Sequence, residues 1–309
     1  LRHFRKIMLE AKYDLIIWYS PSIFWGPLVH LLKSKHKCPT YLILRDIFPE
    51  WANELGILKK NFAYSFLKSV ANYQYEIADH IGIQSEGNIT YFEGNLRLKA
   101  KIKVLNNWLS EKPNNTSILT KKIHDLCASH KFLYTGNLGI AQGLEIFAEL
   151  AKQLRHSSDY AFIFVGSGSF QGKLESYKIK HDLQNLHIFD PVPENELDSI
   201  CKICDYGIVA LSTKHKSHNI PGKFVTYVKS SLPVIAVVNE NNDLVNIIKN
   251  YGVGVVSCSD DIDDLKAAIW KITQSRKEGV AFTTNCKKLF DEKFKTSEAV
   301  RQIISCTNA

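Results

Sequence analysis

The sequence lacks any apolar run long enough to cross a bilayer, which takes about 20 residues, so it predicts no transmembrane helix. Its start, Leu1-Arg2-His3, has neither an initiator methionine nor the apolar core of a signal peptide, and we expect a fragment or a processed chain. Repeats of solenoid period and low-complexity tracts are also absent. With 45% hydrophobic and 23% charged residues among 309, the composition is globular, and the length favours two domains.

A disulfide framework and a second Cys-x-x-Cys pair are missing as well. The seven cysteines are an odd number scattered along a long chain, which favours reduced thiols in a cytosol. Cys201 and Cys204 form the only Cys-x-x-Cys, "CKIC". With no second pair, they are predicted to lie on a helix beside the core rather than on a metal.

Nucleic-acid motifs are missing too, although the chain is basic. Lys and Arg number 39 and Asp and Glu 31, a net charge of +8 that suits phosphate ligands, nucleic acid or an anionic membrane. Without an RNA motif, a zinc-finger spacing or a basic zipper, nucleic acid is not expected as a partner. The stretches His30–Lys37 and Leu96–Lys103 are rich in lysine and indicate either contact with anionic lipid or ordinary solvated faces.

What the sequence does have is an alternation of apolar strands with helices. In the first part, a long helix is expected over Phe62–Asp79, and the expected strands are Tyr13–Tyr19, Thr40–Asp46, His80–Ser85 and Lys101–Asn107. In the second part, the expected strands are "KFLYTG", "AFIFVG", "LHIFD", "YGIVAL", "LPVIAVV" and "GVGVV". Apolar strands separated by helices are typical of a parallel sheet covered on both faces. The sequence therefore predicts an α/β fold of two doubly wound domains, the first without its opening strands.

The domain boundaries follow from the polar segment Ser110–Ser117, "SEKPNNTS", which is the best linker in the chain. We place an N-terminal, truncated domain at residues 1–110 and a second, complete domain at 111–283. Residues 284–309 are expected to be C-terminal helices, with the option of crossing back to the first domain.

Glycines follow two consecutive strands of the second domain. Ligands of such sheets bind at the carboxyl ends of the strands, near helix N-termini that favour anions. Gly136, Gly139 and Gly143 lie between a strand and a helix, where backbone N–H groups can approach a phosphate, although a plain tight turn would use them equally well. Gly166 and Gly168 repeat the arrangement after the next strand, which favours the phosphate.

A second phosphate signal lies in "HNIPGKFVTYVK", where a helix begins at Pro221, Gly222 and Lys223. Proline in the first helical turn loses no hydrogen bond, and glycine lets a ligand approach the backbone. A lysine at the positive end of a helix is unfavourable unless an anion neutralises both. We therefore predict that this helix start holds a diphosphate; the alternative is an exposed lysine on a solvated helix.

In the first domain, charged residues follow the strand "YLIL". Arg45, Asp46 and Glu50 lie in the segment "LRDIFPEW", at the carboxyl end of that strand, and are candidates for the reacting centre. The alternative is structural: Asp46 caps a helix whose first turn contains Glu50.

Five segments carry a resemblance to a known family. They are "LRDIFPEWANELGIL", "YTGNLGIAQGLE", "FIFVGSGSFQGKLES", "IFDPVPENELDSICKICDYGIVAL" and "HNIPGKFVTYVKSSLPVIA". Taken in this order, they resemble bacterial glycosyltransferase family 4 enzymes of the GT-B fold, and most of all the O-antigen fucosaminyltransferase-like branch. The resemblance implies two Rossmann-like domains facing a cleft, with the first one truncated here. It also implies a UDP-sugar donor held mainly by the second domain, and a reaction without metal or cofactor that retains the anomeric configuration.

The same resemblance assigns the donor site by residue. The turn after the first strand would face the diphosphate, the next turn would border the nucleotide, and the helix start would flank the phosphates and the sugar. The residues so implied are Gly136, Asn137, Gly139, Gln142, Gly143, Gly166, Gly168, Val192, Asn219, Pro221, Gly222, Lys223 and Thr226.

The sequence departs from the family at several of these positions. Family members often have Arg and Lys at the positions of Asn137 and Gln142, and two glutamates at those of His218 and Thr226. A His-Asp pair of the family appears here as Arg45-Asp46. Lys223 is expected to supply the cation that the glycine turn does not have.

The resemblance and these residues together predict a reaction. An N-acetylated hexosamine, N-acetylfucosamine, would pass from a UDP donor to a lipid-linked saccharide in O-antigen or capsule biosynthesis. Fixed N–H groups and Lys223 would stabilise the leaving diphosphate, and Asp46 or Glu50 would orient the acceptor for front-face attack. The alternatives are a nucleotide-sugar epimerase of the same fold and a UDP-sugar-binding pseudo-enzyme or fragment. A cytoplasmic protein is expected, with peripheral contact to the inner membrane as an open option.

Overall fold

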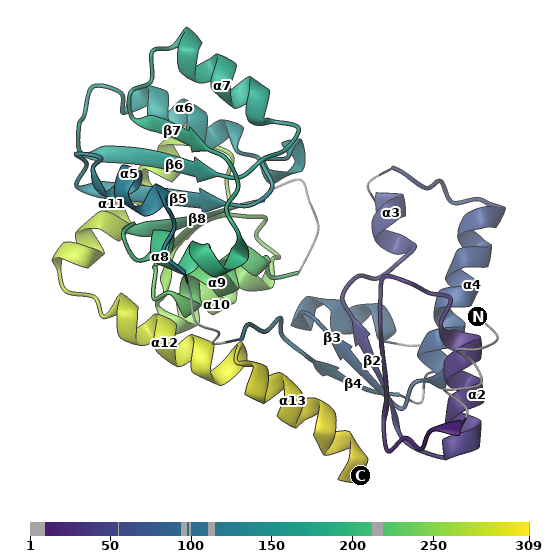
Figure 1. Cartoon of the computed structure of the whole chain (residues 1–309). Helices are drawn as coiled ribbons and strands as arrows, with labels where there is room; N and C mark the ends of the chain where they lie inside the picture. The colour runs from purple at the N-terminus through teal and green to yellow at the C-terminus, as the bar shows by residue number, and fades with distance from the viewer. Residues whose placement is uncertain are drawn as a thin grey trace. The chain divides into compact units, whose positions relative to one another are not determined.

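The structure is a computed structural model of the chain, and it describes residues 10–54, 56–93, 98, 100–110, 115–211 and 219–308. The chain divides into two compact units, each with its own sheet (Figure 1). Unit 1 comprises Leu1–Asn106 with Ser297–Ala309, and unit 2 comprises Asn107–Thr296. The predicted linker lies partly outside the described residues, since 111–114 are not among them.

Unit 1 contains a four-stranded parallel sheet in the order β1-β2-β3-β4. Its strands are β1 (Ile16–Tyr19), β2 (Thr40–Leu44), β3 (His80–Ile83) and β4 (Lys101–Val104). Its helices are α2 (Gly26–His36), α3 (Glu50–Glu54), α4 (Phe62–Ile77), η1 (Glu86–Phe92), most of α13 (Thr296–Ile304) and η4 (Ser305–Asn308). The first expected strand is therefore shorter than the sequence predicts, while the long helix is confirmed within two residues. The C-terminal helix belongs to this unit, where Gln302 Nε2 donates to Tyr41 Oη of β2 at 3.2 Å.

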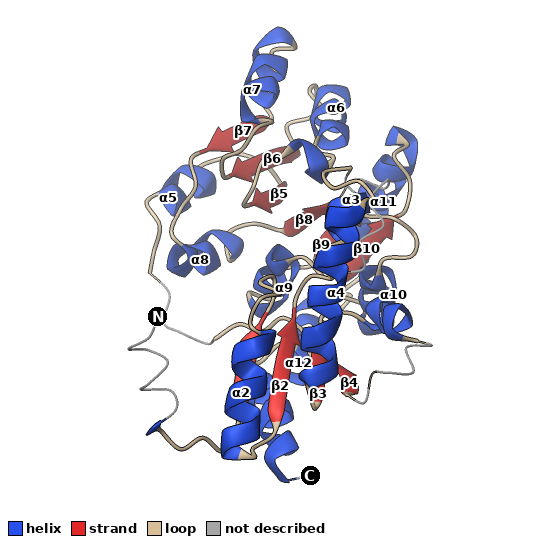
Figure 2. Cartoon of the chain, turned by 90° about the vertical axis from the view of Figure 1, so that its right-hand side faces the viewer, coloured by secondary structure: helices blue, strands red, loops and turns tan. Residues whose placement is uncertain are grey.

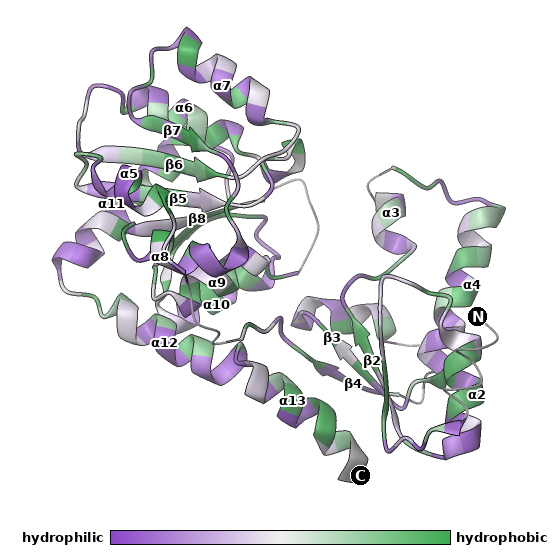
Figure 3. Cartoon of the chain, in the orientation of Figure 1, coloured by the Kyte–Doolittle hydropathy of each residue, from purple (hydrophilic) through white to green (hydrophobic). Residues whose placement is uncertain are grey.

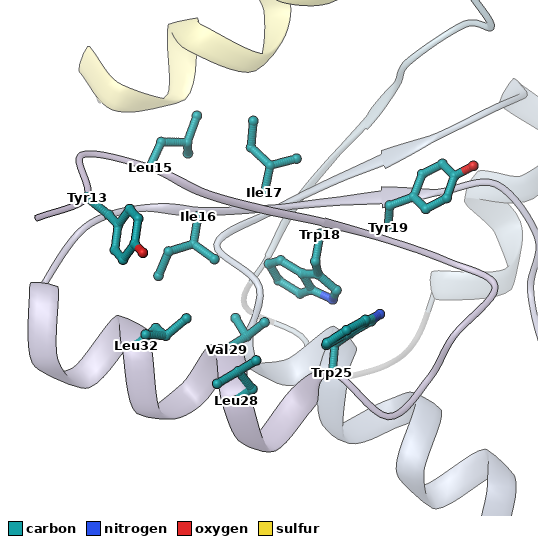
Figure 4. A pocket seen from close by; sticks show the side chains of 10 residues that line it. All are labelled: Tyr13, Leu15, Ile16, Ile17, Trp18, Tyr19, Trp25, Leu28, Val29 and Leu32. Carbon is teal, nitrogen blue, oxygen red and sulfur yellow. The ribbon is translucent and has the colours of Figure 1, made fainter. Parts of the chain in front are cut away.

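An apolar pocket of about 440 Å³ lies beside β1 and α2 (Figure 4). Ile16 and Trp18 point from β1 toward α2, and Ile17 points to the other side of the strand. Ile16 N donates to Pro39 O, just before β2. Successive residues of a strand direct their backbone groups to opposite sides, so the N–H and C=O groups of Ile17 and Tyr19 point away from β2. Within the described part of unit 1, β1 is thus an open sheet edge with an apolar lining. The pocket is lined by Tyr13, Leu15, Ile16, Ile17, Trp18, Tyr19, Trp25, Leu28, Val29 and Leu32.

Unit 2 contains a six-stranded parallel sheet in the order β10-β9-β8-β5-β6-β7, which confirms the predicted set of six strands. They are β5 (His130–Thr135), β6 (Tyr160–Val165), β7 (Leu186–Phe189), β8 (Tyr206–Ala210), β9 (Val234–Val237) and β10 (Gly254–Ser257). The helices are α5 (Leu119–His124), η2 (Ile140–Gln142), α6 (Glu145–Gln153), α7 (Gln171–Lys180), η3 (Glu194–Glu196), α8 (Leu197–Cys201), α9 (Gly222–Lys229), α10 (Asp243–Tyr251), α11 (Ile262–Lys277) and α12 (Phe282–Lys293).

Helices cover both faces of the unit 2 sheet, as a doubly wound fold requires (Figure 2). Strand residues alternate between the faces: Leu133 of β5 belongs to one buried cluster, and its neighbours Phe132 and Tyr134 belong to the other. Helices α5, α8, α9, α10 and α12 pack on the first face, and α6, α7 and α11 on the second. The predicted α/β class is therefore confirmed.

The two cysteines of "CKIC" are buried in unit 2. Cys201 ends α8 and Cys204 lies just beyond it, and both belong to the core cluster on the first face. Burial raises the pKa of the Cys201 thiol to about 12, so it is protonated at neutral pH. Among the residues that the structure describes, no group of three or more His, Cys, Asp and Glu side chains is placed to hold a metal ion.

In the part of the chain that the structure describes, no helix combines the length and apolar content that crossing a bilayer requires.

Candidate functional site

The carboxyl ends of β5 and β8 form the topological switch point of unit 2. From β5 the chain moves outward through β6 and β7, and from β8 it moves the other way through β9 and β10. Where the order reverses, the loops after neighbouring strands leave in opposite directions and open a crevice for ligands. The predicted glycine turn follows β5, and α9 follows β8 along the chain. Both halves of the predicted donor site therefore leave from strands that meet at the switch point.

Lys223, in the first turn of α9, places its ammonium over the end of β5. Nζ donates to Tyr134 Oη at 2.7 Å and to Gln142 Oε1 at 3.2 Å, and it lies 4.0 Å from the centroid of the Tyr134 ring. No carboxylate among the described residues forms an ion pair with it. Burial lowers the pKa of Lys223 to about 7, far below the ordinary value of 10.5. The group is half-buried and touches only neutral acceptors, which is the arrangement of a cation that is completed by an anionic ligand.

Tyr227 fixes the position of Lys223, because the two residues are one helical turn apart on α9 and share a face. The Tyr227 hydroxyl accepts from the backbone N of Thr135 at 2.9 Å and is fully buried. Its ring lies against Gly207 of β8, where a Cβ would come within 2.4 Å of a ring carbon. The helix is therefore tied to both strands of the switch point, and Lys223 can reach only the turn that follows β5.

Tyr134 connects Lys223 to the glycine turn. Its hydroxyl lies 2.8 Å from Asn137 O and 3.3 Å from Gln142 Oε1. Because the hydroxyl has one proton and already accepts from Lys223, its proton goes to the nearer Asn137 carbonyl. Burial raises the pKa of Tyr134, so it stays a neutral donor. Two of the predicted turn residues, Asn137 and Gln142, are thus joined in one network with the predicted lysine.

Three of the predicted glycines lie where the turns pack closely, and Gly166 and Gly168 are required because a Cβ there would meet backbone atoms of Gly136 and Leu138. A Cβ at Gly166 would lie 1.8 Å from the carbonyl oxygen of Gly136, and one at Gly168 would lie 2.5 Å from Asn137 Oδ1. A Cβ at Gly139 would lie 2.8 Å from Asn137 Nδ2. Since real Cβ atoms do not come so close, the structural alternative raised by the sequence accounts for Gly166 and Gly168 without any ligand.

Gly136, Gly143 and Gly222 are different. Gly136 has φ +105° and Gly143 has φ +63°, conformations that other residues rarely adopt. The only atom near a Cβ at Gly136 is Lys223 Cε, at 3.9 Å, and near Gly222 there is nothing within 4 Å. Gly222 therefore borders open space, and a Cβ at Gly136 would make only an ordinary contact with Lys223, as expected if a ligand approaches there.

The start of α9 offers backbone donors to that space. Pro221 is the N-cap, with φ −63° and ψ 139°, one position earlier than the first-turn placement that the sequence suggested. The first N–H groups of a helix have no partner within the helix, and they carry the positive end of its dipole. The backbone before the helix is held by Asn107, whose Nδ2 donates to Ile220 O at 3.3 Å.

The remaining predicted donor residues lie around this centre. Asn219 is half-buried just before Pro221, and the Thr226 hydroxyl donates to the Gly222 carbonyl at 3.3 Å. Val192 is half-buried and packs against the first-face core after β7. His218 lies outside the described residues.

In unit 1, Arg45 and Asp46 are exposed directly after β2. Their backbone N–H groups donate to Ser20 Oγ, at 2.8 and 3.3 Å. Since Ser20 follows β1, the serine joins the carboxyl ends of two neighbouring strands. The loop that carries Asp46 is therefore fixed at the edge of the sheet where ligands of this fold bind.

Glu50, the first residue of α3, has a different setting. Its side chain is only 16% exposed, and Oε1 accepts from Tyr91 Oη at 2.7 Å and lies 3.0 Å from Lys68 Nζ. Its other oxygen is buried with no hydrogen-bond partner among the described residues. The bond to Glu50 raises the pKa of Lys68. Glu50 therefore stabilises unit 1 from within, and its position in the first turn of α3 matches the structural alternative.

Sequence reasoning missed Tyr134 and Tyr227, which position the lysine. Both were included in quoted segments, but a tyrosine in an apolar strand or on the inner face of a helix is ordinarily a core residue. The sequence did contain a signal. Tyr134 and Tyr227 each place a hydroxyl group in an otherwise apolar segment, the first just before the predicted turn and the second just after the predicted lysine.

Two Rossmann-like parallel-sheet units in one chain are the architecture of the GT-B class of α/β proteins. Residues 125–289, more than half of the chain, match the family described as "Glycosyl transferases group 1". The chain belongs to this family.

Two curated relatives align with the chain. "Probable glycosyltransferase WbjE" of Pseudomonas aeruginosa is 24% identical over 219 residues, which are 69% of this chain and 54% of the relative. "Putative colanic acid biosynthesis glycosyl transferase WcaI" of Escherichia coli K12 is 23% identical over 283 residues, 84% of this chain and 66% of the relative. The chain thus spans less than two thirds of either one.

A solved structure shares the fold. The crystal structure of Anabaena Alr3699/HepE in complex with UDP superposes with a TM-score of 0.73 and 14% identity, over 98% of this chain and 80% of that one. At this identity the likeness shows the fold, which is GT-B with two Rossmann-like domains.

Proposed function

We propose that the protein is a retaining glycosyltransferase with a UDP-sugar donor. In our proposal it transfers an N-acetylated hexosamine, N-acetylfucosamine, to a lipid-linked saccharide in O-antigen or capsule biosynthesis. The observation that carries the donor part is Lys223, a half-buried cation without a carboxylate partner among the described residues, at the switch point of unit 2. The names of WbjE and WcaI and the UDP complex of HepE support the same class of activity. The choice of sugar rests on the resemblance of the sequence segments alone.

The donor diphosphate would bind between the glycine turn and the start of α9. Lys223 supplies a positive charge there, and the first N–H groups of α9 supply fixed donors. The interactions of the diphosphate with Lys223 and with these N–H groups become stronger as negative charge builds on the leaving group. Interactions that are stronger in the transition state lower the reaction barrier. Gly136 and Gly222 leave the space for that approach.

The acceptor would meet the loop after β2 in unit 1. Asp46 is exposed there and is our candidate for orienting the acceptor hydroxyl, with Arg45 beside it. Glu50 contributes by holding α3 through Tyr91 and Lys68. No second carboxylate that could act as a nucleophile stands out, so we propose front-face attack guided by the leaving phosphate.

Calorimetry with UDP tests the donor site. Lys223→Ala should weaken UDP affinity about 10- to 100-fold, because a hydrogen bond to a charged group is worth roughly 1.5–3 kcal/mol. Lys229→Ala is the matched control, since Lys229 lies at the other end of the same helix, and it should leave the affinity unchanged. Equal affinity of Lys223→Ala and the unaltered protein would refute the diphosphate site.

The reaction is tested by incubating the protein with UDP-N-acetylhexosamines, with and without a lipid-linked saccharide. We expect UDP release only when the acceptor is present. Interconversion of the sugar nucleotides without acceptor would instead identify an epimerase, and UDP binding with neither reaction would identify a binding protein.

A further inference from the structure

A corner between α3 and α4 exposes large apolar side chains to solvent. We call it the α3–α4 corner and define it by Ile57, Lys59, Lys60, Phe62 and Phe66. Phe62 is 88% exposed, Ile57 71% and Phe66 55%. The corner lies where α4 begins, next to α3 (Figure 1), and hydrophobic residues recur along α4 in Figure 3. Since water disfavours such a cluster on a monomer, a surface of this kind indicates an interaction site.

The exposure follows from the way α4 packs. The helix begins after Asn61, which caps it by accepting from Tyr64 N, and its inner face is formed by Ala71, Gln74, Tyr75 and Ile77. Phe62 and Phe66 are one turn apart and lie on the outer face, so neither contributes to the core of unit 1. The exposed rings of Phe62 and Phe66 are therefore not needed for the fold.

The sequence around the corner contains more basic than acidic residues. From Gly56 to Tyr75 it has Lys59, Lys60 and Lys68 and no Asp or Glu, while α3 before it contains Glu50 and Glu54. Lys68 is engaged by Glu50, while Lys59 and Lys60 are exposed beside Ile57 and Phe62. Exposed phenylalanines flanked by lysines fit the boundary of an anionic lipid bilayer, where acyl chains accept the rings and headgroups accept the ammonium groups.

We infer that the α3–α4 corner docks on an anionic phospholipid surface, with Ile57, Phe62 and Phe66 inserted and Lys59 and Lys60 at the headgroups. The inference does not depend on the proposed donor or acceptor. In a parallel sheet the corner lies at the same edge as the Arg45-Asp46 loop, because α4 runs back from that edge to the start of β3. A lipid-linked substrate would therefore reach the same edge of unit 1.

Four described residues of the basic stretches singled out by the sequence lie at the other end of α4. His30, Lys33, Lys37 and Lys101 line a polar pocket at the amino-terminal edge of the unit 1 sheet. Glu76 and Asp79 line it too, and Lys33 is paired with Asp79 at 2.7 Å. The pocket offers charge of both signs, and Tyr73 is the one large exposed apolar side chain among the residues that line it. Because α4 has 16 residues, the two surfaces are about 24 Å apart and can be tested separately.

Vesicle sedimentation with the whole chain tests the inference. The vesicles are phosphatidylcholine alone and phosphatidylcholine mixed with phosphatidylglycerol. The protein should bind the mixed vesicles and not the neutral ones. Phe62→Ser with Phe66→Ser should lower the partition coefficient at least about tenfold, since the water-exposed rings would no longer gain from burial. Lys59→Ser with Lys60→Ser should lower it roughly tenfold or more at low salt, and less at high salt.

Unit 2 offers matched controls in Ile118, Lys121 and Lys122. Ile118 is 86% exposed and the two lysines beside it are exposed, but no other large exposed apolar side chain accompanies them in α5. Ile118→Ser and Lys121→Ser with Lys122→Ser should leave vesicle binding unchanged. Because the substituted side chains of both sets are exposed, circular dichroism should show all variants folded.

Three results would overturn the inference. The first is vesicle binding by the phenylalanine variant that equals that of the unaltered protein. The second is loss of binding in Lys37→Ser with Lys101→Ser while the corner variants still bind, which would place the lipid at the opposite edge. The third is a dimer in sedimentation velocity that the phenylalanine variant abolishes, together with no binding to anionic vesicles, which would make the corner an interface between copies.

Discussion

Among the residues that the structure describes, two lysines pack on tyrosine rings, one in each unit, and their surroundings are opposite. In unit 1, Lys68 Nζ lies 5.9 and 5.8 Å from the ring centroids of Tyr64 and Tyr91 and 3.0 Å from Glu50 Oε1. In unit 2, Lys223 Nζ lies 4.0 Å from the Tyr134 centroid and bonds only to neutral oxygens. The pKa of Lys68 is raised, first of all by its bond to Glu50, and burial lowers that of Lys223 to about 7.

The difference distinguishes a lysine with a structural partner from the lysine that we propose binds the donor. Both ammonium groups lose water, which disfavours the charged form. For Lys68 the carboxylate offsets that loss within the fold, and nothing further is needed. For Lys223 no such partner is present among the described residues, so no counter-charge offsets the lost hydration of its ammonium group until an anion binds. A folded protein that keeps a half-buried cation without a counter-charge has a reason outside its own stability.

The largest effect on UDP affinity is expected when Lys223 is given a carboxylate partner, as Lys68 has. Gln142→Glu places an acid 3.2 Å from Nζ, at the atom that already accepts from it. The pair should raise the pKa of Lys223 and fill the anion site from within. UDP affinity should fall about 100-fold or more, because a charge-assisted contact worth roughly 1.5–3 kcal/mol is lost and a like charge faces the diphosphate.

Calorimetry with UDP measures this change, and thermal unfolding shows that the fold is kept. The control is Gln171→Glu, which changes the same residue type at the half-buried first position of α7 in the same unit, where Gln171 donates to Glu175 and contacts no cation among the described residues. If Gln142→Glu binds UDP as well as the control does, the diphosphate does not use Lys223.

The opposite change is made in unit 1. Glu50→Gln removes the carboxylate from Lys68 and leaves the Tyr91 hydroxyl with a neutral acceptor. We expect a loss of about 1.5–3 kcal/mol in the unfolding free energy of unit 1, the range for hydrogen bonds to charged groups. UDP affinity should stay the same, since the proposed donor site lies in unit 2. Urea unfolding followed by calorimetry checks both, and unaltered stability would contradict a structural Glu50.

Sequence reasoning predicted the sheet of unit 2 well because its strands are apolar on both faces and are separated by helices. It predicted the location of Gly136 and Lys223 because the alternation of apolar strands with helices shows where strands end and helices begin. It did not predict that Gly166 and Gly168 serve the contact between two turns, since that contact depends on how two loops meet in space. It also gave Glu50 an acceptor role, because partners as distant in sequence as Lys68 and Tyr91 cannot be read from a strand-end motif.

The lysines should also differ in how pH affects them. The pKa of Lys223 in the free protein is about 7, and a bound diphosphate should raise it. As pH rises through 7, the free protein loses the charge, so UDP affinity should fall by up to about tenfold per pH unit until the pKa of the complex is passed. At pH 8, binding should take up a proton, which calorimetry detects in two buffers of different ionisation enthalpy.

Lys223→Met serves as the control for this pH effect, because UDP itself titrates near pH 6 and does so equally with both proteins. A pH dependence of affinity above 7 that is the same in Lys223→Met would assign the effect to another group. The stability contribution has the opposite sign: between about 7 and 10.5 the unfolded chain holds a proton that folded Lys223 lacks, so this group lets stability rise with pH.

The smallest expected effect on UDP affinity is that of Gly222→Ala, which separates the contribution of a residue to stability from its contribution to ligand binding. A Cβ at Gly222 would meet nothing within 4 Å, and its φ is not in the left-handed region, so Gly222→Ala should be neutral or stabilise unit 2 by about 0.4–1 kcal/mol. If the diphosphate approaches the start of α9, the added methyl group should still weaken UDP binding several-fold. The control is Gly172→Ala at the start of α7, where a Cβ likewise meets nothing and no ligand is expected. Stability and UDP affinity should therefore change in opposite directions at Gly222 and only stability should change at Gly172. A Gly222→Ala protein that binds UDP as tightly as Gly172→Ala would show that the open space at the helix start is not where the diphosphate lies.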